Sequence, residues 1–392
     1  MQYRICDKTG ERISVLGYGC LRFSKSGLGI DQKKTERELT LAFEQGVNYY
    51  DTAYIYPGSE EALGKWLCQG YRHKVYVATK APQYMLKDLQ AFDRCLAQQL
   101  QRLRTDYIDY YLLHMLNDPA QWRRLCDLGL EAWLARQRAA GKIRHVGFSF
   151  HGGTAHFQQI LDAYDWDICY LQYNYLDETS QAGVRGVHYA AQKGVGVVVM
   201  EPLRGGRLAG KLPKAAKAAF ARAPQQRTPT DWALRWLWNQ REIPCVLSGM
   251  NDTTQILENT ATADSAVVGE LTERDQAMFE EVRRILRKST KIGCTGCGYC
   301  MPCPAGVDIP VCFRAYNDRC SEGWYTGIKE YLMCTTLKKT PTNAALCVGC
   351  GKCEQHCPQG LEIRKGLREV QRQMEGPIYY LAGKVLKTVA KY

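Results

Sequence analysis

Eleven of the 18 cysteines in this 392-residue chain lie between Cys294 and Cys357. Eight of them form two runs with short gaps: Cys294, Cys297, Cys300 and Cys303, then Cys347, Cys350, Cys353 and Cys357. A proline follows each run. Thiolates spaced in this way wrap a [4Fe–4S] cluster, whereas zinc sites usually use two separate C-x-x-C pairs. The runs therefore predict two [4Fe–4S] clusters.

The spacing also predicts how the runs share their ligands. In two-cluster ferredoxins the fourth cysteine of each run binds the other cluster. By that rule one cluster takes Cys294, Cys297, Cys300 and Cys357, and the other takes Cys347, Cys350, Cys353 and Cys303. The first run is one residue shorter before Cys303, which the crossed arrangement tolerates because Cys303 need not reach back to its own run. Three cysteines between the runs are expected to be core thiols: Cys312, Cys320 and Cys334.

A second set of reactive side chains lies in the N-terminal part, each just after a short apolar run. It comprises Asp51, Tyr56, Lys80 and His114. Each residue alone is more often structural than functional. Together they offer a carboxylate, a phenol, an ammonium and an imidazole, which are the groups that move protons in general acid–base catalysis.

The elements that must position these residues alternate between strands and helices. Strand patterns occur at 15–19, 47–51, 75–80, 108–114, 145–149, 169–172, 196–200 and 245–248. Helical patterns between them include 34–45, 86–103 and 122–140, and a charged one covers 273–288. Eight strands alternating with helices over about 250 residues predict an α/β fold, a parallel (β/α)₈ TIM barrel. Residues 1–13 are expected to form a hairpin that caps the barrel bottom. The acid–base residues then fall at the C-terminal ends of strands, where such barrels hold their active sites.

The N-terminal 285 residues resemble the aldo-keto reductase family. The matching motifs are Asp51-Thr52-Ala53-x-x-Tyr56, Lys80, Asp109 to His114, Val146 to Ser149, Leu171 to Asn174, Pro202-Leu203 and Glu258-Asn259. With the cysteine runs added, the chain resembles the iron–sulfur branch of that family, a barrel followed by a small, mainly helical ferredoxin-like domain. We therefore expect two domains, residues 1–285 and 286–392.

The resemblance implies interconversion of a carbonyl and an alcohol by hydride transfer, with Tyr56 as the general acid/base. The residue types support this, because a tyrosine with an ordinary pKa of about 10 needs help at neutral pH. A nearby ammonium favours phenolate, so Lys80 would assist Tyr56, and Asp51 would hold Lys80 charged and oriented. His114 would donate to the carbonyl oxygen of the small carbonyl or alcohol substrate.

The resemblance also implies a nicotinamide dinucleotide as cofactor, NADP(H) or NAD(H). At the positions where the family usually binds a 2′-phosphate this chain has Gly249, Met250 and Gln255, which carry no positive charge, so NAD(H) stays open beside NADP(H). The implied contacts are Ser149, Gln172, Pro202, Leu203, Gln255, Glu258 and Asn259. Arg204 and Arg207, in the glycine-rich loop 203–208, are candidate replacements for the lost positive charge. Alternatively, they are solvated loop arginines.

Electron counting leaves three hypotheses open. A nicotinamide gives up two electrons at once, whereas a [4Fe–4S] cluster accepts one. The protein is then a carbonyl reductase with structural or regulatory clusters, or an electron-transfer enzyme that uses an external ferredoxin-like carrier, or a non-catalytic redox sensor that binds nicotinamide. A flavin would split the electron pair, but no motif demands one.

The charge and the hydropathy of the chain limit which other functional classes it can belong to. Lys and Arg number 52 against 40 Asp and Glu, and residues 286–392 hold 16 against 8. The basic excess comes without aromatic–basic motifs, so no nucleic-acid role is expected. No apolar stretch is long enough to span a membrane and no signal-peptide pattern opens the chain, so we expect a cytoplasmic protein without a transmembrane segment. The tail 377–392 has helical spacing and is expected to pack as a helix with a lysine face.

Overall fold

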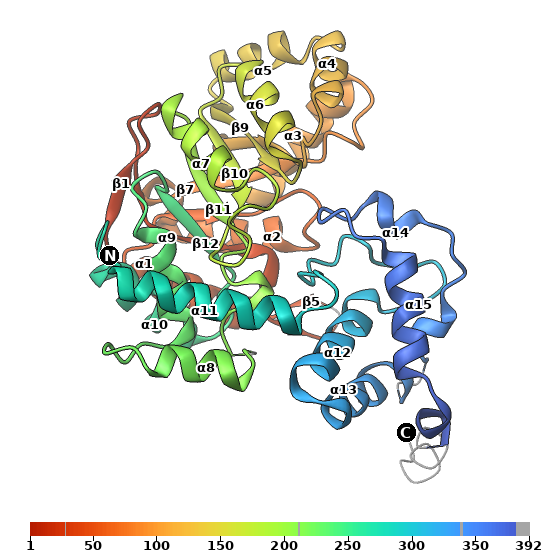
Figure 1. Cartoon of the computed structure of the whole chain (residues 1–392). Coiled ribbons are helices and arrows are strands. Elements are labelled where there is room, and N and C mark those ends of the chain that lie inside the picture. Colours follow the sequence, from red (N-terminus) through yellow and green to blue (C-terminus); the bar gives the residue numbers. More distant parts are fainter. Residues whose placement is uncertain (28, 211, 338–339, 382–392) are drawn as a thin grey trace. The chain divides into compact units, whose positions relative to one another are not determined.

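The computed structural model describes all residues except 28, 211, 338–339 and 382–392. By internal contacts the chain divides into two compact units (Figure 1). The first comprises residues 1–202 and 230–272, and the second comprises residues 203–229 and 273–392. The compositional boundary near residue 285 falls inside one helix, α11 (Glu273–Ser289), which belongs to the second unit.

Eight parallel strands close into a barrel in the first unit, which confirms the predicted fold. They are β3 (Leu16–Gly19), β6 (Tyr49–Asp51), β7 (Tyr76–Ala81), β8 (Ile108–Leu113), β9 (Ile143–Phe150), β10 (Ile168–Gln172), β11 (Gly196–Met200) and β12 (Cys245–Ser248). Each pairs with the next, and β12 pairs back with β3. Because side chains alternate along a strand, Tyr49 and Asp51 share one face of β6, and Tyr170 and Gln172 share one face of β10.

The expected N-terminal hairpin is present as β1 (Tyr3–Ile5) paired antiparallel with β2 (Arg12–Ser14). Ile13 is fully buried in the barrel core. Arg4 donates hydrogen bonds to the carbonyl oxygens of Gln240 and Ile243, both at 2.6 Å. These carbonyls lie in the loop that leads into β12, so the hairpin covers the N-terminal end of the barrel.

The first unit surrounds its barrel with helices (Figure 1). They are α1 (Gln32–Glu44), α2 (Ser59–Trp66), α3 (Leu89–Leu103), α4 (Pro119–Asp127), α5 (Leu130–Ala139), α6 (Thr154–Asp162), α7 (Gly183–Gln192), α9 (Pro229–Trp238) and α10 (Thr253–Ser265). The prediction of one helix over 122–140 was wrong. Gly129 has φ +83°, a left-handed conformation that only glycine adopts easily, and it divides the stretch into α4 and α5.

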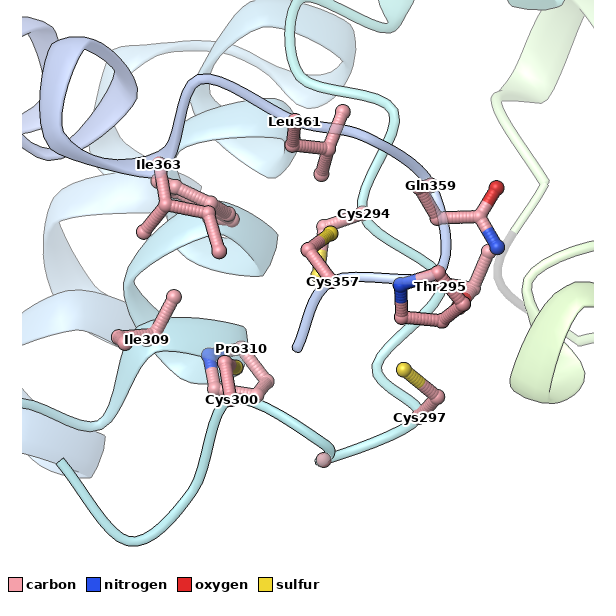
Figure 2. Close-up of a pocket in the computed structure, with 13 residues that line it drawn as sticks. Cys294, Thr295, Cys297, Cys300, Ile309, Pro310, Cys357, Gln359, Leu361 and Ile363 are labelled. Atoms are coloured by element: carbon pink, nitrogen blue, oxygen red, sulfur yellow. The ribbon is translucent and has the colours of Figure 1, made fainter. Parts of the chain in front are cut away.

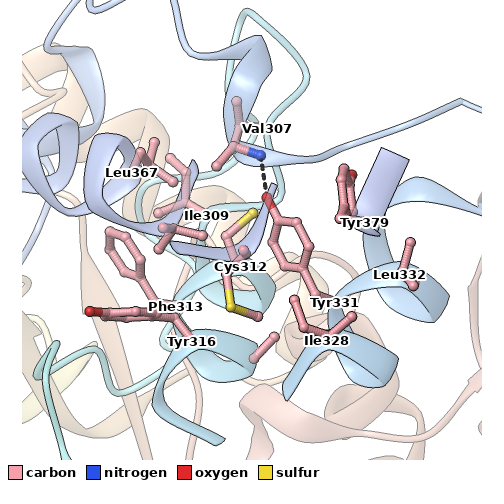
Figure 3. Close-up of a cluster of buried hydrophobic side chains, with 14 of the residues drawn as sticks. Val307, Ile309, Cys312, Phe313, Tyr316, Ile328, Tyr331, Leu332, Leu367 and Tyr379 are labelled. Carbon is pink, nitrogen blue, oxygen red and sulfur yellow. Dashed lines mark hydrogen bonds between the residues drawn. The ribbon is translucent and has the colours of Figure 1, made fainter. Parts of the chain in front are cut away.

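The second unit is helical and has its own core. Besides α11 it contains α8 (Lys214–Ala221), α12 (Ile309–Glu322), α13 (Trp324–Tyr331), α14 (Lys352–Gln355) and α15 (Ile363–Met374). Tyr331 lies among the apolar side chains of this core (Figure 3). Its hydroxyl accepts a hydrogen bond from the Ala344 amide at 2.8 Å and donates one to Glu375 at 2.6 Å. Between the cysteine runs lie α12 and α13, in agreement with the expected mainly helical domain, and one π-helical turn, Leu332–Thr336, continues α13.

Among the cysteines between the runs, Cys312 is fully buried in this core, as predicted. Cys320 is exposed and Cys334 is half-buried, so the prediction of a core thiol was wrong for Cys320. The helix expected over 377–392 lies mainly outside the described residues. Within the described part of the chain, no helix combines the length and apolarity that crossing a membrane would need.

Candidate active site and cysteine-lined cavities

A buried ion pair lies at the C-terminal ends of β6 and β7. The Lys80 ammonium is 2.6 and 2.7 Å from the two carboxylate oxygens of Asp51 and 2.7 Å from the carbonyl oxygen of Thr52. Lys80 is 1% exposed and Asp51 is 4% exposed. Burial lowers the pKa of Lys80 and raises the pKa of Asp51, and the attraction between the two charges opposes both shifts.

Tyr56 and His114 lie close to this pair. The Lys80 nitrogen is 5.2 Å from the centre of the Tyr56 ring. The Tyr56 and His114 rings are 6.1 Å apart and nearly perpendicular. Burial, and secondarily the positive charge of Lys80, lower the pKa of His114 well below its ordinary value, so His114 is neutral at pH 7. The structure thus brings all four predicted acid–base residues together at one end of the barrel.

Two buried tyrosines lie beneath the ion pair, and sequence reasoning missed them. The hydroxyls of Tyr170 and Tyr49 are 2.8 Å apart, and the Lys80 nitrogen is 5.3 Å from the Tyr170 ring centre. Hydrogen bonding from Tyr170 opposes the effect of burial on the pKa of Asp51 and so favours its carboxylate form. The signal was available, because Tyr170 lies two residues before Gln172 and therefore on the same face of β10.

The expected nicotinamide contacts at the strand ends are Ser149 and Gln172, and both are buried. The Ser149 hydroxyl accepts a hydrogen bond from the Met115 amide at 2.9 Å. The Gln172 amide donates to Asp177 at 3.3 Å and accepts from Gln181 at 3.1 Å. These groups are fixed in place at neighbouring strands, which suits the recognition of a planar amide-bearing ring.

His151, two residues beyond Ser149, was also missed. Its amide donates to the Asn117 side chain at 2.7 Å. Burial lowers its pKa to about 4, and its charge is among those that lower the pKa of His114. The site therefore contains two neutral imidazoles. A histidine directly after a strand end was the signal in the sequence.

The expected dinucleotide contacts near the end of the barrel lie on or beside α10. Gln255 and Glu258 are exposed, and Asn259 is buried with its amide donating to the Ser248 hydroxyl at 3.2 Å. Asp252 caps α10 by accepting a hydrogen bond from Thr254 at 2.8 Å, so a carboxylate stands at this helix start. Arg22 packs its aliphatic stem over Gly249 and is the basic side chain that sequence reasoning missed.

The remaining expected contacts follow β11. Pro202 ends the first unit, whereas Leu203 and Arg207 belong to the second. Arg207 donates to the Cys294 carbonyl at 3.1 Å, and Arg204 donates to the Gly293 carbonyl at 3.1 Å. Both guanidinium groups therefore hold the backbone where the first cysteine run begins.

One cavity of the second unit is lined by four cysteines from both runs (Figure 2). They are Cys294, Cys297, Cys300 and Cys357. Ile309, Leu361 and Ile363 supply apolar walls. Burial and the neighbouring thiolates raise the pKa of Cys300 to about 12. Four thiolates can coexist here only with a compensating positive charge, such as the iron of a cluster.

A second cavity has the complementary quartet. It is lined by Cys303, Cys347, Cys350 and Cys353. Cys350 is exposed, and Val348 beside it is 75% exposed. Among the described residues no three His, Cys, Asp or Glu side chains converge as they would on a single metal ion. The four cysteines line one cavity, and four cysteine thiolates are the donor set that a [4Fe–4S] cluster uses.

The two cysteine runs are related by an internal repeat. Each has a glycine on either side of its second cysteine, and all four glycines have positive φ: Gly296, Gly298, Gly349 and Gly351. Each run continues as Cys-Pro-x-Gly-x-acidic-Ile, and that isoleucine, Ile309 or Ile363, begins a helix. The left-handed glycines turn the backbone around each cavity. This repeat was visible in the sequence and was not used to predict the geometry.

Comparisons with known proteins agree with both units. The model of the Aldo/keto reductase family matches residues 15–284, and that of the 4Fe-4S dicluster domain matches residues 293–362. The oxidoreductase YrpG of Bacillus subtilis (strain 168) is 30% identical over 237 residues, which cover 54% of this chain and 69% of YrpG. L-galactose dehydrogenase of Arabidopsis thaliana is 28% identical over 316 residues, covering 73% of this chain and 94% of the plant enzyme.

Among solved structures, the holo form of aldo-keto reductase AKR11C1 from Bacillus halodurans has a TM-score of 0.59 at 25% identity. The match covers 72% of this chain and 96% of that one. An aldo-keto reductase from Klebsiella pneumoniae in complex with NADPH has the same TM-score at 22% identity, over 72% of this chain and 95% of its own, and supports the fold. The chain belongs to the aldo/keto reductase family, in which it is an oxidoreductase whose barrel is followed by a 4Fe-4S dicluster domain.

Proposed function

We propose that the barrel interconverts a small carbonyl compound and its alcohol, with Tyr56 as the general acid/base. The observation that carries this is the preformed Lys80–Asp51 pair, 2.6 Å apart and with its ammonium 5.2 Å from the centre of the Tyr56 ring. A bound nicotinamide dinucleotide supplies or accepts the hydride. The Tyr56 hydroxyl gives its proton to the carbonyl oxygen in reduction, and the Lys80 ammonium stabilises the phenolate that remains.

The other residues of the site orient the reactants. Neutral His114 donates a hydrogen bond to the substrate oxygen without competing as a proton donor. Ser149 and Gln172 hold the nicotinamide amide, and residues of α10 contact the adenosine part. The carboxylate of Asp252 at the start of α10 disfavours a 2′-phosphate, whereas the guanidinium of Arg22 favours one. We expect Arg22→Gln to raise the KM for NADPH more than that for NADH.

The experiment that tests the barrel chemistry is Tyr56→Phe. The variant removes one hydroxyl and keeps the ring, so it should bind nicotinamide normally and lose NAD(P)H-dependent carbonyl reduction by a factor of at least about 10². Tyr54→Phe, two residues earlier in the same loop, is the matched control and should retain activity. Near-normal turnover by Tyr56→Phe would overturn the mechanism.

We further propose two [4Fe–4S] clusters, with the crossed ligand sets that line the two cavities. The thiol chemistry fits iron, because eight cysteines form two quartets around separate spaces. Each cluster exchanges one electron. A second candidate function is therefore electron transfer between the barrel site and an external ferredoxin-like carrier. It is favoured by the excess of 16 basic over 8 acidic residues in the segment 286–392, which suits an acidic carrier. A non-catalytic sensor does not account for the buried ion pair.

A further inference from the structure

A groove with a basic rim lies beside the first cysteine-lined cavity, and all of its lining residues belong to the second unit. The basic side chains are Lys291, Lys365, Arg368 and Arg372. The acidic ones are Glu362 and Glu369. Tyr316, Ile292 and Leu361 contribute apolar surface. The groove thus combines an excess of positive charge with some apolar surface, and such charge favours the approach of an anionic partner.

Much of the positive charge is available to a partner. Lys365 pairs with Glu362 at 2.9 Å and Arg372 pairs with Glu369 at 2.7 Å, each on an exposed helix face. Each of these pairs carries no net charge, so the excess positive charge of the groove lies on its other two basic side chains. Lys291 and Arg368 are exposed and make no salt bridge within the described part of the chain, although the charge of Arg368 is among those that lower the pKa of Glu354. These two charges point to an anionic partner.

The groove and the first cavity share a lining residue. Leu361 lines both the groove and the cavity, and it is seen beside Cys294 in Figure 2. Lys291 and Ile292 of the groove lead directly to Cys294, and their amides donate to the buried Asn317 side chain at 2.9 and 3.0 Å. A partner in the groove would therefore lie close to the first cluster.

The second cavity lacks such a rim. Its one basic lining residue is Arg364, which is held by Glu354 at 2.8 Å. Near it Val348 and Leu346 are exposed, together with one lysine, Lys352, next to Cys353. The two cavities therefore differ in the charge that surrounds them, and the basic side belongs to the quartet that contains Cys294 and Cys357.

We propose that an acidic one-electron carrier protein docks in this groove and exchanges electrons with the cluster held by Cys294, Cys297, Cys300 and Cys357. The inference rests on the proposed clusters. Each step moves one electron between the carrier and this cluster, so that one is oxidised as the other is reduced and no proton or co-reactant is needed. The positive rim accelerates the encounter by electrostatic steering.

The test measures cluster reduction in the anaerobic holoenzyme by stopped-flow mixing with a reduced plant-type [2Fe–2S] ferredoxin of net negative charge. Lys291→Glu/Arg368→Glu should slow this reaction at least about tenfold at low ionic strength and flatten its salt dependence. Reduced methyl viologen, a small cation, should reduce the same variant at least as fast as the parent.

Two control variants locate the effect. Lys352→Glu places the same charge change within the second cysteine run, and Lys329→Glu places it on the exposed face of α13. Both should keep the parent rate. Slowing by Lys352→Glu alone would move the docking site to the second cavity, and equal rates for all variants would exclude docking in the groove. Iron content and methyl viologen reduction on the same samples report separately whether the clusters exist.

Discussion

In the barrel, a buried cation and a buried anion lie 2.6 Å apart, whereas in the second unit four thiols face one another across a cavity. The barrel site is electrostatically complete as its own chain builds it, since Lys80, Asp51 and the Thr52 carbonyl satisfy one another. The cysteine cavities concentrate groups that are costly to ionise, since burial first, and neighbouring thiolates second, raise the pKa of Cys300. We therefore expect the barrel geometry to survive loss of iron, and the geometry of the cavities to depend on bound iron.

The two sites also differ in the secondary structure that carries their reactive residues. Asp51 and Lys80 stand on paired strands of a closed sheet, and the Lys80 carbonyl accepts a hydrogen bond from buried Gln99 at 3.2 Å. Except for Cys353, which lies in α14, the cysteines of the two runs stand on loops turned by left-handed glycines, and Arg204 and Arg207 hold the first loop through its carbonyls. In the barrel, the sheet fixes the positions of the reactive side chains. In the second unit, a bound cluster and a few hydrogen bonds would fix the positions of the cysteines.

The largest effect is expected from breaking the barrel pair. Lys80→Met leaves the Asp51 carboxylate buried without its partner, which should lower the free energy of unfolding of the barrel by about 3–5 kcal/mol and abolish carbonyl reduction. The double variant Asp51→Asn/Lys80→Met should recover most of the stability and none of the activity. Chemical denaturation of both variants checks this. If the single variant were as stable as the double one, the pair would not be electrostatically coupled as described.

An intermediate effect is expected from removing a charge beside the first cavity. Arg207→Gln keeps a side-chain N–H donor for the Cys294 carbonyl and loses the positive charge. The reduced cluster is the more negative state, so its reduction potential should fall by tens of millivolts, where about 59 mV is a tenfold change for one electron. Redox titration followed by electron paramagnetic resonance measures it. Arg222→Gln, which removes an exposed arginine paired with Glu281 on α11, should leave the potential unchanged; an equal shift there would contradict a local role for Arg207.

The smallest effect concerns pH. The pKa of His114 is well below its ordinary value in the folded protein, so the unfolded chain binds the extra proton first. Stability from this residue is complete above about pH 6.5 and declines as the pH falls below it, by at most about 1.4 kcal/mol per unit. His114→Gln should therefore flatten the pH dependence of unfolding between about pH 7 and about pH 5. His156→Gln, at an exposed position, should not; if it did, the effect would not belong to the buried imidazole.

Much of the barrel and its acid–base set could be predicted from the sequence, because strand period and strand-end residues carry local signals. Tyr170 and His151 had such signals and were overlooked. Gly129 also had one, since a glycine inside a helical pattern indicates a possible break. The contact between Arg207 and Cys294 had no such signal, because no local pattern reveals that a loop after β11 holds the backbone of a residue 87 positions away. The exposure of Cys320 depends equally on packing between helices.

We infer that the chain binds two iron–sulfur clusters with crossed ligand sets, and that the geometry of its barrel site does not depend on iron. The iron content of the protein and its cysteine variants tests this inference. The parent protein, purified anaerobically, should contain about eight iron atoms per chain. Cys297→Ala/Cys357→Ala removes two ligands of one proposed cluster and should retain about four irons, whereas Cys350→Ala/Cys357→Ala removes one ligand from each and should retain almost none. The reverse pattern in the two double variants, or about four irons in the parent, would contradict the account.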